Sequence, residues 1–420
     1  MPISFVKSRN KYTYLAFLIV TGVLISIVLA RLKHGTPFWE KTVFDVGFGF
    51  GQVVENIVKH GEYFLKRGEC NLVFEAARLP ALPFLLYIFS LISPALWFAY
   101  LLKNLVFVAA FGIVLWPFVS DLKRFYTLYG LVFAVTFLSP LVAVHATAIE
   151  YEEGLIYFVV VSGVAGLLYR NSKGAWLATG AAVLLLLTKS SMFAAAGVLT
   201  VFAAYRLYQL RSWRSASIPV VLFAAVLLGW GVTFSGPIHG LALGSKMSSW
   251  NGVNLYKANN PVTDSLYPGT TLDKLTGSHV YWSRDLQEHC FESEWGANQY
   301  YLDQAWSYMA ENPGTTARRW GVRLYLSLLE VRDWTEGDLP TWPSMIVLRL
   351  LFLPLLGLAA TSLFTSAGLR RDTALLFLLL SGALIAPYVI GFVYQRHLIV
   401  LQGISIPVLL AYYQHFRSDE

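Results

Sequence analysis

Apolar runs close to the length of a bilayer crossing recur along almost the whole chain, and this feature constrains the fold most. A helix needs about 20 mostly apolar residues to cross the hydrocarbon core. Only 14% of the 420 residues are charged, whereas soluble domains carry about 25%. The sequence therefore predicts an all-α, polytopic bundle of transmembrane helices and argues against a soluble α/β enzyme. The runs lie at about 13–30, 81–92, 95–117, 126–145, 151–169, 174–189, 190–205, 215–236, 344–366, 373–393 and 398–414.

Basic residues between these runs predict the orientation of the helices. Cytoplasmic loops are enriched in Lys and Arg, and the segment 237–343 then lies on the opposite, external side together with 31–79. If every run before 237–343 crosses the membrane once, the number of crossings differs by one from the number that this orientation requires. The run 81–92 is too short to span at about 1.5 Å per residue, so we expect 81–117 to cross once, for about 10–11 spans in all. The basic clusters are Lys7/Arg9/Lys11, Lys123/Arg124, Arg170/Lys173, Arg206/Arg211/Arg214 and Arg370/Arg371.

The same runs divide the chain into three parts. We expect an N-terminal membrane module, 1–236, that contains the first external loop, 31–79. An external, periplasmic region follows at 237–343, and C-terminal membrane helices occupy 344–420. The run 13–30 is long for a signal-peptide core and is expected to be an uncleaved first helix.

Both external segments contain further predicted elements. Apolar residues at helical spacing within 46–67 predict an amphipathic helix that lies on the membrane. Residues 297–311 and 315–332 predict two more helices, separated by Asn312-Pro313. Turn-forming pairs predict an irregular loop over 251–290.

Net charge and cysteines narrow the function classes further. The formal net charge is +7, but the basic residues follow the pattern of topology signals and lipid contacts rather than of nucleic-acid binding. Cys70 and Cys290 both fall in predicted external segments, where a disulfide is compatible with the environment. Without evidence of proximity, two unpaired thiols are favoured. No Cys/His spacing indicates a zinc site.

Ionisable residues from distant parts of the sequence are predicted to meet on the external face. Ionisable groups near membrane depth are costly, so they tend to be functional or paired. A carboxylate beside Lys and Arg is what a site needs to activate a hydroxyl and to hold a phosphate. The candidates are Asp45, Glu75, Arg78, Glu150, Glu152, Glu153, Lys189, Arg396 and His397.

Each of these candidates also has a structural interpretation. Asp45 can serve as a general base or cap the amphipathic helix. Glu75 and Arg78 have the spacing of a helical ion pair. Lys189 is an isolated cation on the external side, where it can contact a phosphate or extend to the interface.

The remaining candidates flank late or central membrane helices. Arg396 precedes a membrane helix, and its planar donors match two phosphate oxygens, although a topological anchor explains it too. His397 adjoins it. Glu150, Glu152 and Glu153 stand where acidic residues favour a helix dipole, and we expect at least one of them to face the site.

An ordered set of short stretches resembles the GT-C-type membrane glycosyltransferases, which include protein O-mannosyltransferases and bacterial aminoarabinose transferases. Asp45 in the first external loop matches the place of that family's catalytic aspartate. RLPALPFLLYIFSLI resembles its Arg-Pro-Pro-x-x-Pro motif, and FLSPLVAVHATAIEYEEGL resembles its Ser-Pro segment followed by an acidic residue. WLATGAAVLLLLTKSSM resembles its Gly-rich helix that ends in Leu-Thr-Lys/Arg-Pro.

Three later stretches extend the resemblance to nearly the whole chain. WNGVNLYKANNP and NQYYLDQAWSYMAENP resemble external-loop pieces of bacterial members, and YQRHLIVLQGISIPVLLAYY resembles the family's Arg-Tyr run. The chain departs from the pattern at three places: no second acidic residue follows Asp45, Ser190 replaces a Pro, and His397 replaces a Tyr.

The resemblance implies an inverting transfer of a sugar from a polyprenyl-phosphate donor to an acceptor hydroxyl on the external face of a bacterial inner membrane. Asp45 would be the base, and Lys189, Arg396 and His397 would hold the donor phosphate. Glu75, Arg78, Glu150 and Glu153 would complete the site. The acceptor is a glycan, lipid or protein, and metal dependence stays open.

Two other functions fit parts of the same pattern. A transporter or flippase for lipid-linked sugars would need polar residues at several membrane depths, whereas the candidates here gather at one face. An O-antigen-type polymerase would share the lipid-linked substrate and often has an arginine-rich external loop, which Arg318, Arg319 and Arg323 echo.

Overall fold

The structure is a computed structural model, and it describes most of the chain. The described residues are 20, 24, 39–47, 49–67, 72–103, 152–234, 247–266, 290–329, 342–365, 369–391 and 395–418. Their structure is mostly helical, as predicted. A short antiparallel hairpin, β1 (Leu65–Arg67) and β2 (Leu72–Phe74), is the addition to an all-α description.

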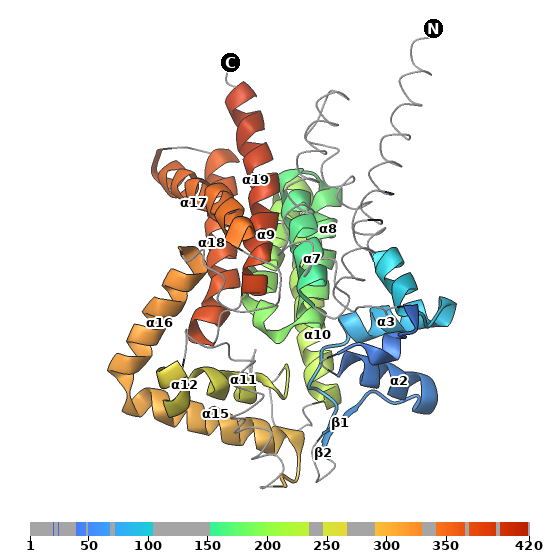
Figure 1. The fold of residues 1–420 in the computed structure, drawn as a ribbon. Coiled ribbons are helices and arrows are strands. Elements are labelled where there is room, and N and C mark those ends of the chain that lie inside the picture. The colour runs from blue at the N-terminus through green and yellow to red at the C-terminus, as the bar shows by residue number, and fades with distance from the viewer. Residues whose placement is uncertain are drawn as a thin grey trace.

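A bundle of long helices forms the upper part of the molecule (Figure 1). It contains α7 (Glu152–Leu168), α8 (Ser172–Thr188), α9 (Phe193–Leu210) and α10 (Trp213–Phe234), and then α17 (Trp342–Thr365), α18 (Leu369–Ile390) and α19 (Ile399–Ser418). These helices match predicted apolar runs. Four described spans, Ser190–Leu210, Trp213–Thr233, Met345–Thr365 and Arg370–Ile390, are long and apolar enough to cross a membrane. The chain is therefore a membrane protein.

Helix α7 lies at the centre of this bundle, and nearly all its side chains are buried. A helix that is apolar on every side is buried on every side. Small residues permit its close contacts with neighbouring helices, as is usual in membranes. A Cβ on Gly403 of α19 would lie 2.7 Å from Tyr157 and Val161 of α7, so only glycine fits there.

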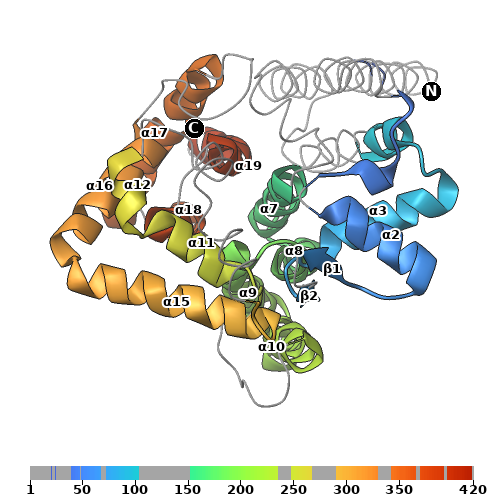
Figure 2. The ribbon, with the colours of Figure 1, turned by 60° about the horizontal axis from the view of Figure 1, so that its bottom comes forward.

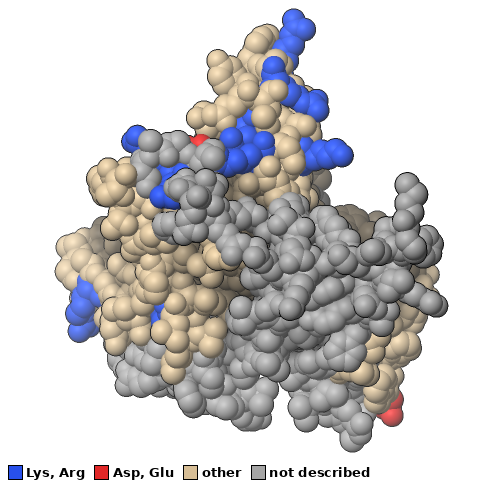
Figure 3. All heavy atoms as spheres, turned by 90° about the horizontal axis from the view of Figure 1, so that it is seen from above, with Lys and Arg blue, Asp and Glu red and all other residues tan. Residues whose placement is uncertain are grey.

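The two ends of the bundle differ in charge. The end seen from above in Figure 3 carries blue Lys and Arg side chains and little red on its described surface. Arg170, Lys173, Arg206, Arg211, Arg214, Arg370 and Arg371 lie at the helix ends on this side. By the positive-inside rule, we expect this to be the cytoplasmic end and the opposite end to be external. We call them the basic end and the outer end.

Helix α3 (Ala81–Ile92) does not run along the bundle. It lies across the outer end beside α2 (Phe50–His60), as Figures 1 and 2 agree. Its 12 residues give it a length of about 18 Å, well short of a bilayer core of about 30 Å. This placement accords with the expectation that 81–92 is not itself a crossing, while the total number of spans stays a prediction.

The predicted amphipathic helix of 46–67 is α2, which is shorter than expected. Its apolar face, Phe50, Val53 and Val54, is buried. The chain then turns at Gly61, whose φ of 70° lies in the left-handed region that favours glycine. The residues that follow form the β1–β2 hairpin instead of continuing the helix.

The external region forms a helical layer beneath the bundle. Its helices are α11 (Asn251–Ala258), α12 (Pro261–Leu266), α15 (Glu294–Glu311) and α16 (Pro313–Leu328). The last two confirm the predicted helices at 297–311 and 315–332. The prediction of an irregular loop over 251–290 is wrong for 251–266, where Asn260 caps the start of α12 by accepting from Val262 N and Thr263 N at 2.9 and 3.0 Å.

Arg323 links this layer to the bundle through hydrogen bonds. Its side chain is fully buried and donates to the carbonyl of Ile390 at 2.9 Å and to that of Ala258. Both carbonyls lie at helix C-termini, where backbone acceptors have no helical partner and a cation is favoured. Arg319 donates to Asn260 O at 2.8 Å. Both arginines therefore have a structural role in joining these helices.

Cys290 is disulfide-bonded, and no described cysteine is free. The sequence has one other cysteine, Cys70, which lies outside the described residues. The expectation of two unpaired thiols is wrong.

Candidate functional site

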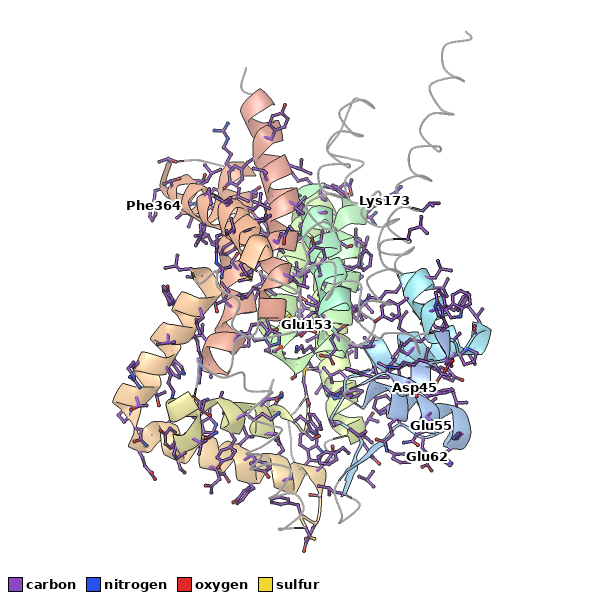
Figure 4. All side chains as sticks on the ribbon, viewed as in Figure 1. Asp45, Glu55, Glu62, Glu153, Lys173 and Phe364 are labelled. Carbon is purple, nitrogen blue, oxygen red and sulfur yellow. The ribbon has the colours of Figure 1, made fainter. Side chains whose placement is uncertain are left out.

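Four predicted site residues meet at the outer end of the bundle. Lys189 Nζ lies 2.8 Å from Glu153 Oε1 and 3.9 Å from Glu152 Oε2. His397 Nε2 lies 3.4 Å from the same Glu153 oxygen. Residues separated by more than 200 positions therefore share one carboxylate, as the predicted topology requires. Figure 4 places Glu153 at the lower end of the bundle.

The helix ends position each of these side chains. Glu152 and Glu153 form the first turn of α7, where carboxylates favour the helix dipole. Lys189 directly follows α8 and adopts an extended backbone there. His397 lies in η5 (Gln395–Leu398), a single 3₁₀ turn that precedes α19. The site is thus built from the outer ends of three neighbouring helices.

Burial makes this cluster electrostatically strong. Glu153 and His397 are 7% and 5% exposed at the side chain, whereas Lys189 is 22% exposed. Burial is the largest single effect and would lower the pKa of Lys189, but Glu153, Tyr388 and Glu152 together outweigh it, so the pKa lies above its ordinary value. Lys189 is therefore a charged ammonium group. It is also the more accessible member of the pair.

Tyr388 packs against the ring of His397. The two rings are stacked, with centroids 4.1 Å apart and planes 15° from parallel. Tyr388 lies in α18, so the ring of His397 is held between an aromatic face and the Glu153 carboxylate. This partner could not be predicted from the sequence, because a Tyr near the end of a membrane helix is an ordinary interfacial residue.

Arg78 connects the cluster to the first external loop. Its guanidinium carbon lies 4.7 Å from the ring centroid of Phe50 and 4.7 Å from that of Trp250. Such cation–π contacts fix the plane of the side chain. Burial lowers the pKa of Arg78, and Glu152 acts against this effect. Arg78 therefore stands between α2 and the carboxylates of α7.

The external layer holds the backbone around Arg78 in place. Glu294, at the start of α15, accepts from Glu75 N and Ala76 N, each at 3.2 Å. Ser249 N donates to Ala76 O at 3.2 Å, and Ser248 Oγ donates to Ala77 O at 3.2 Å. Glu294 was missed by sequence reasoning, which has no local signal for a carboxylate that binds backbone groups more than 200 residues away.

The external layer also touches the segment that carries Lys189. Ser190 Oγ donates to Asn251 Oδ1 at 2.7 Å, at the first residue of α11. Behind it, Gly252 N donates to Asn298 Oδ1 at 2.7 Å. The start of α11 is therefore hydrogen-bonded to the residue that follows Lys189.

Asp45 lies apart from this cluster. Figure 4 shows it beside α2 and α3, to one side of Glu153. It ends the 3₁₀ turn η2 (Val43–Asp45) and accepts at Oδ2 from Thr42 N at 2.7 Å and Thr42 Oγ1 at 2.8 Å. These hydrogen bonds lower its pKa. Asp45 is an exposed, ionised carboxylate that caps its own turn rather than the amphipathic helix.

The other predicted residues divide into placed and undescribed ones. Glu75 is exposed in the bend after β2, so it forms no helical pair with Arg78. Glu150 lies outside the described residues. The backbone of Arg396 lies in η5 next to His397, while its side chain lies outside the described part. The structure thus brings together Glu152, Glu153, Lys189 and His397, with Arg78 beside them.

Within the described residues, no group of three or more His, Cys, Asp or Glu side chains is placed to hold a metal ion. Comparisons with protein-family models, with curated proteins and with solved structures each found no match. The case for a function therefore stands on the geometry of the outer end and on the sequence resemblance.

Proposed function

We propose that the chain is a glycosyltransferase of a bacterial plasma membrane that transfers a sugar from a polyprenyl-phosphate donor to an acceptor hydroxyl. The observation that carries this proposal is the buried Glu153 carboxylate, which lies within 3.4 Å of both Lys189 and His397. A lipid-linked phosphate arrives from the membrane, so its contacts have to lie at the ends of membrane helices.

Lys189 and His397 are the proposed phosphate contacts. An ammonium group has three donors, so contact with Glu153 leaves Lys189 with capacity to bind a phosphate oxygen from its exposed side. Glu153 contacts both Lys189 and His397 and acts as a positioning residue. Arg396, next to His397 in the same turn, is the proposed third contact.

The reaction balances without a cofactor. A base takes the proton of the acceptor hydroxyl, whose oxygen attacks the anomeric carbon of the sugar. The bond from that carbon to the phosphate oxygen breaks, and its electron pair stays on polyprenyl phosphate. Cations positioned at the leaving phosphate stabilise its additional charge. Attack opposite the leaving group inverts the anomeric centre.

Asp45 is the proposed base. It is ionised and exposed, so it can accept a proton from a hydroxyl in the external solution. The attacked carbon carries the phosphate, so Asp45 has to come close to Lys189 once both substrates are bound. Arg78 lies between the two regions, and its contact with Phe50 links the segment of Asp45 to the cluster.

The test is release of polyprenyl phosphate by the purified full chain, supplied with a panel of polyprenyl-phosphate sugars. Lys189→Gln should lower the rate by about 100-fold, as loss of one charge-stabilising donor does. Lys59→Gln is the matched control, because Lys59 is exposed on α2 and paired only along its own helix, with Glu55. Equal release by both variants would remove Lys189 from the phosphate site.

Two further variants locate the base. Asp45→Asn should abolish release if Asp45 takes the proton, whereas Glu153→Gln should weaken donor binding through Lys189 and His397. If Asp45→Asn releases polyprenyl phosphate as fast as the wild type, Asp45 is a capping residue alone. If the lipid-linked sugar changes leaflet with no release at all, the chain is a transporter.

A further inference from the structure

A second polar site lies at the basic end, on the opposite side of the membrane from the Lys189 cluster. A cleft opens there between the ends of α7 and α9 and the start of α18. Arg170 and Arg206 line it together with Asp372 and Thr373. None of these residues takes part in the reaction proposed above.

Two like charges face this cleft. Arg206 lowers the pKa of Arg170 after the larger effect of burial, and Asp372 acts in the opposite direction. The two guanidinium groups are therefore close enough to repel each other. One carboxylate against two guanidinium groups leaves the cleft with a net positive charge, which an anion would neutralise.

The backbone at Arg170 has an unusual conformation that fixes the position of this residue. Arg170 has a φ of 55°, in the left-handed region that side chains other than glycine seldom adopt. It lies in the short turn between α7 and α8, where Gly174 packs against the Gly166 carbonyl. Such local strain persists only where the surrounding structure fixes it.

The rest of the cleft is apolar and lies at the membrane interface. Phe202 and Tyr205 form its accessible apolar side, with Tyr205 47% exposed, while Leu167 and Leu376 are buried beneath it. Exposed Tyr208 and Trp213 continue this aromatic band, which is typical of the headgroup level. A ligand that fits both parts has a phosphate at one end and hydrocarbon at the other.

We propose that this cleft binds the headgroup of an anionic phospholipid from the leaflet at the basic end. The phosphate accepts hydrogen bonds from Arg170 and Arg206, and the start of α18 adds a favourable dipole. The acyl chains continue past Phe202 and Tyr205 into the bilayer. Basic pockets between membrane helices on the cytoplasmic side suit anionic lipids in general.

The test is binding of phosphatidylglycerol to the purified full chain in detergent, followed by native mass spectrometry, with phosphatidylcholine as the neutral lipid. Phosphatidylglycerol should bind more tightly than phosphatidylcholine. The double variant Arg170→Gln/Arg206→Gln should weaken its binding by about 25-fold, since each of the two basic contacts contributes about fivefold. The matched control is Arg214→Gln/Arg371→Gln, which removes two exposed charges from the same face and should change binding less than about twofold.

Equal weakening by the two double variants would overturn the proposal, because general surface charge would then explain the binding. Inorganic phosphate that displaces the lipid at equal concentration would also overturn it, because the apolar walls would contribute nothing. Asp372→Asn guards against a folding defect, since removing the competing carboxylate should tighten phosphatidylglycerol binding severalfold. Weaker binding by Asp372→Asn would contradict the site.

Discussion

The outer and basic ends of the bundle use charge in opposite ways. At the outer end, Glu152, Glu153 and His397 are buried and lie close to Lys189. At the basic end, cations such as Arg214 and Arg371 are exposed on the surface. Burying charged groups costs free energy unless they are paired. Apolar residues could fill the same place at the outer end, so stability alone does not explain the buried charges there. The difference supports the proposals that place the chemistry at the outer end and the lipid contact at the basic end.

The strongest test of this contrast is Glu153→Gln. Removing one partner of a buried ion pair leaves an uncompensated charge, so we expect the free energy of unfolding to fall by about 3–5 kcal/mol. Unfolding of the detergent-solubilised protein, followed by circular dichroism against denaturant, measures it. Arg371→Gln at the basic end is the control and should cost less than about 0.5 kcal/mol. Similar losses for both would erase the distinction between the two ends.

The sequence was sufficient to predict most of the helices, because hydropathy and loop charge act locally and repeatedly. It also predicted that Lys189, Glu153 and His397 lie at one face, since the topology puts their helix ends on the same side. It could not show that Glu153 is the shared partner, because that depends on how three helices are rotated. It also missed α11 and α12, which are short and polar and gain their stability from packing on α15 and α16.

Residues that act through contacts with distant parts of the chain could not be predicted from the sequence. Glu294 holds the segment before Arg78, and Trp250 covers the Arg78 guanidinium. Neither stands in a pattern with a local meaning. Asp45 shows the converse case. Its position suggested a base, and the structure shows it first as a capping residue bound to Thr42.

The next test sharpens the contrast within the outer end itself. Arg323→Met removes donors to the carbonyls at the ends of α11 and α18, so we expect a loss of about 3 kcal/mol. Arg318→Met is the matched control on the same helix, because Arg318 is exposed. It should change the free energy of unfolding by less than about 0.5 kcal/mol. If the Arg323 variant is as stable as the control, the buried guanidinium group does not contribute to the stability of the outer end.

The basic end should instead depend on backbone packing. A Cβ on Gly174 would lie 2.1 Å from the Gly166 carbonyl oxygen, so Gly174→Ala has to separate α8 from α7. We expect a cost of about 1–3 kcal/mol, as for other overpacked sites. Gly180→Ala on the same helix meets nothing within 4 Å and should stabilise by up to about 1 kcal/mol through helix propensity. Thermal unfolding of the two variants side by side would show opposite shifts, and a stable Gly174 variant would contradict the close packing.

The smallest effect on stability is expected at Asp45, and it decides where the chemistry lies. Hydrogen bonds from Thr42 lower the pKa of Asp45, so its ionised form stabilises the fold above the ordinary Asp pKa of about 3.9, and this contribution is lost as the pH falls through the lowered value. Because the carboxylate is exposed, Asp45→Asn should cost only about 0.5 kcal/mol at neutral pH, with no difference from the wild type in strong acid. If the same variant loses polyprenyl-phosphate release completely, stability cannot explain the loss, and Asp45 acts on the substrate. If release persists, the chemistry belongs to the Lys189 cluster alone.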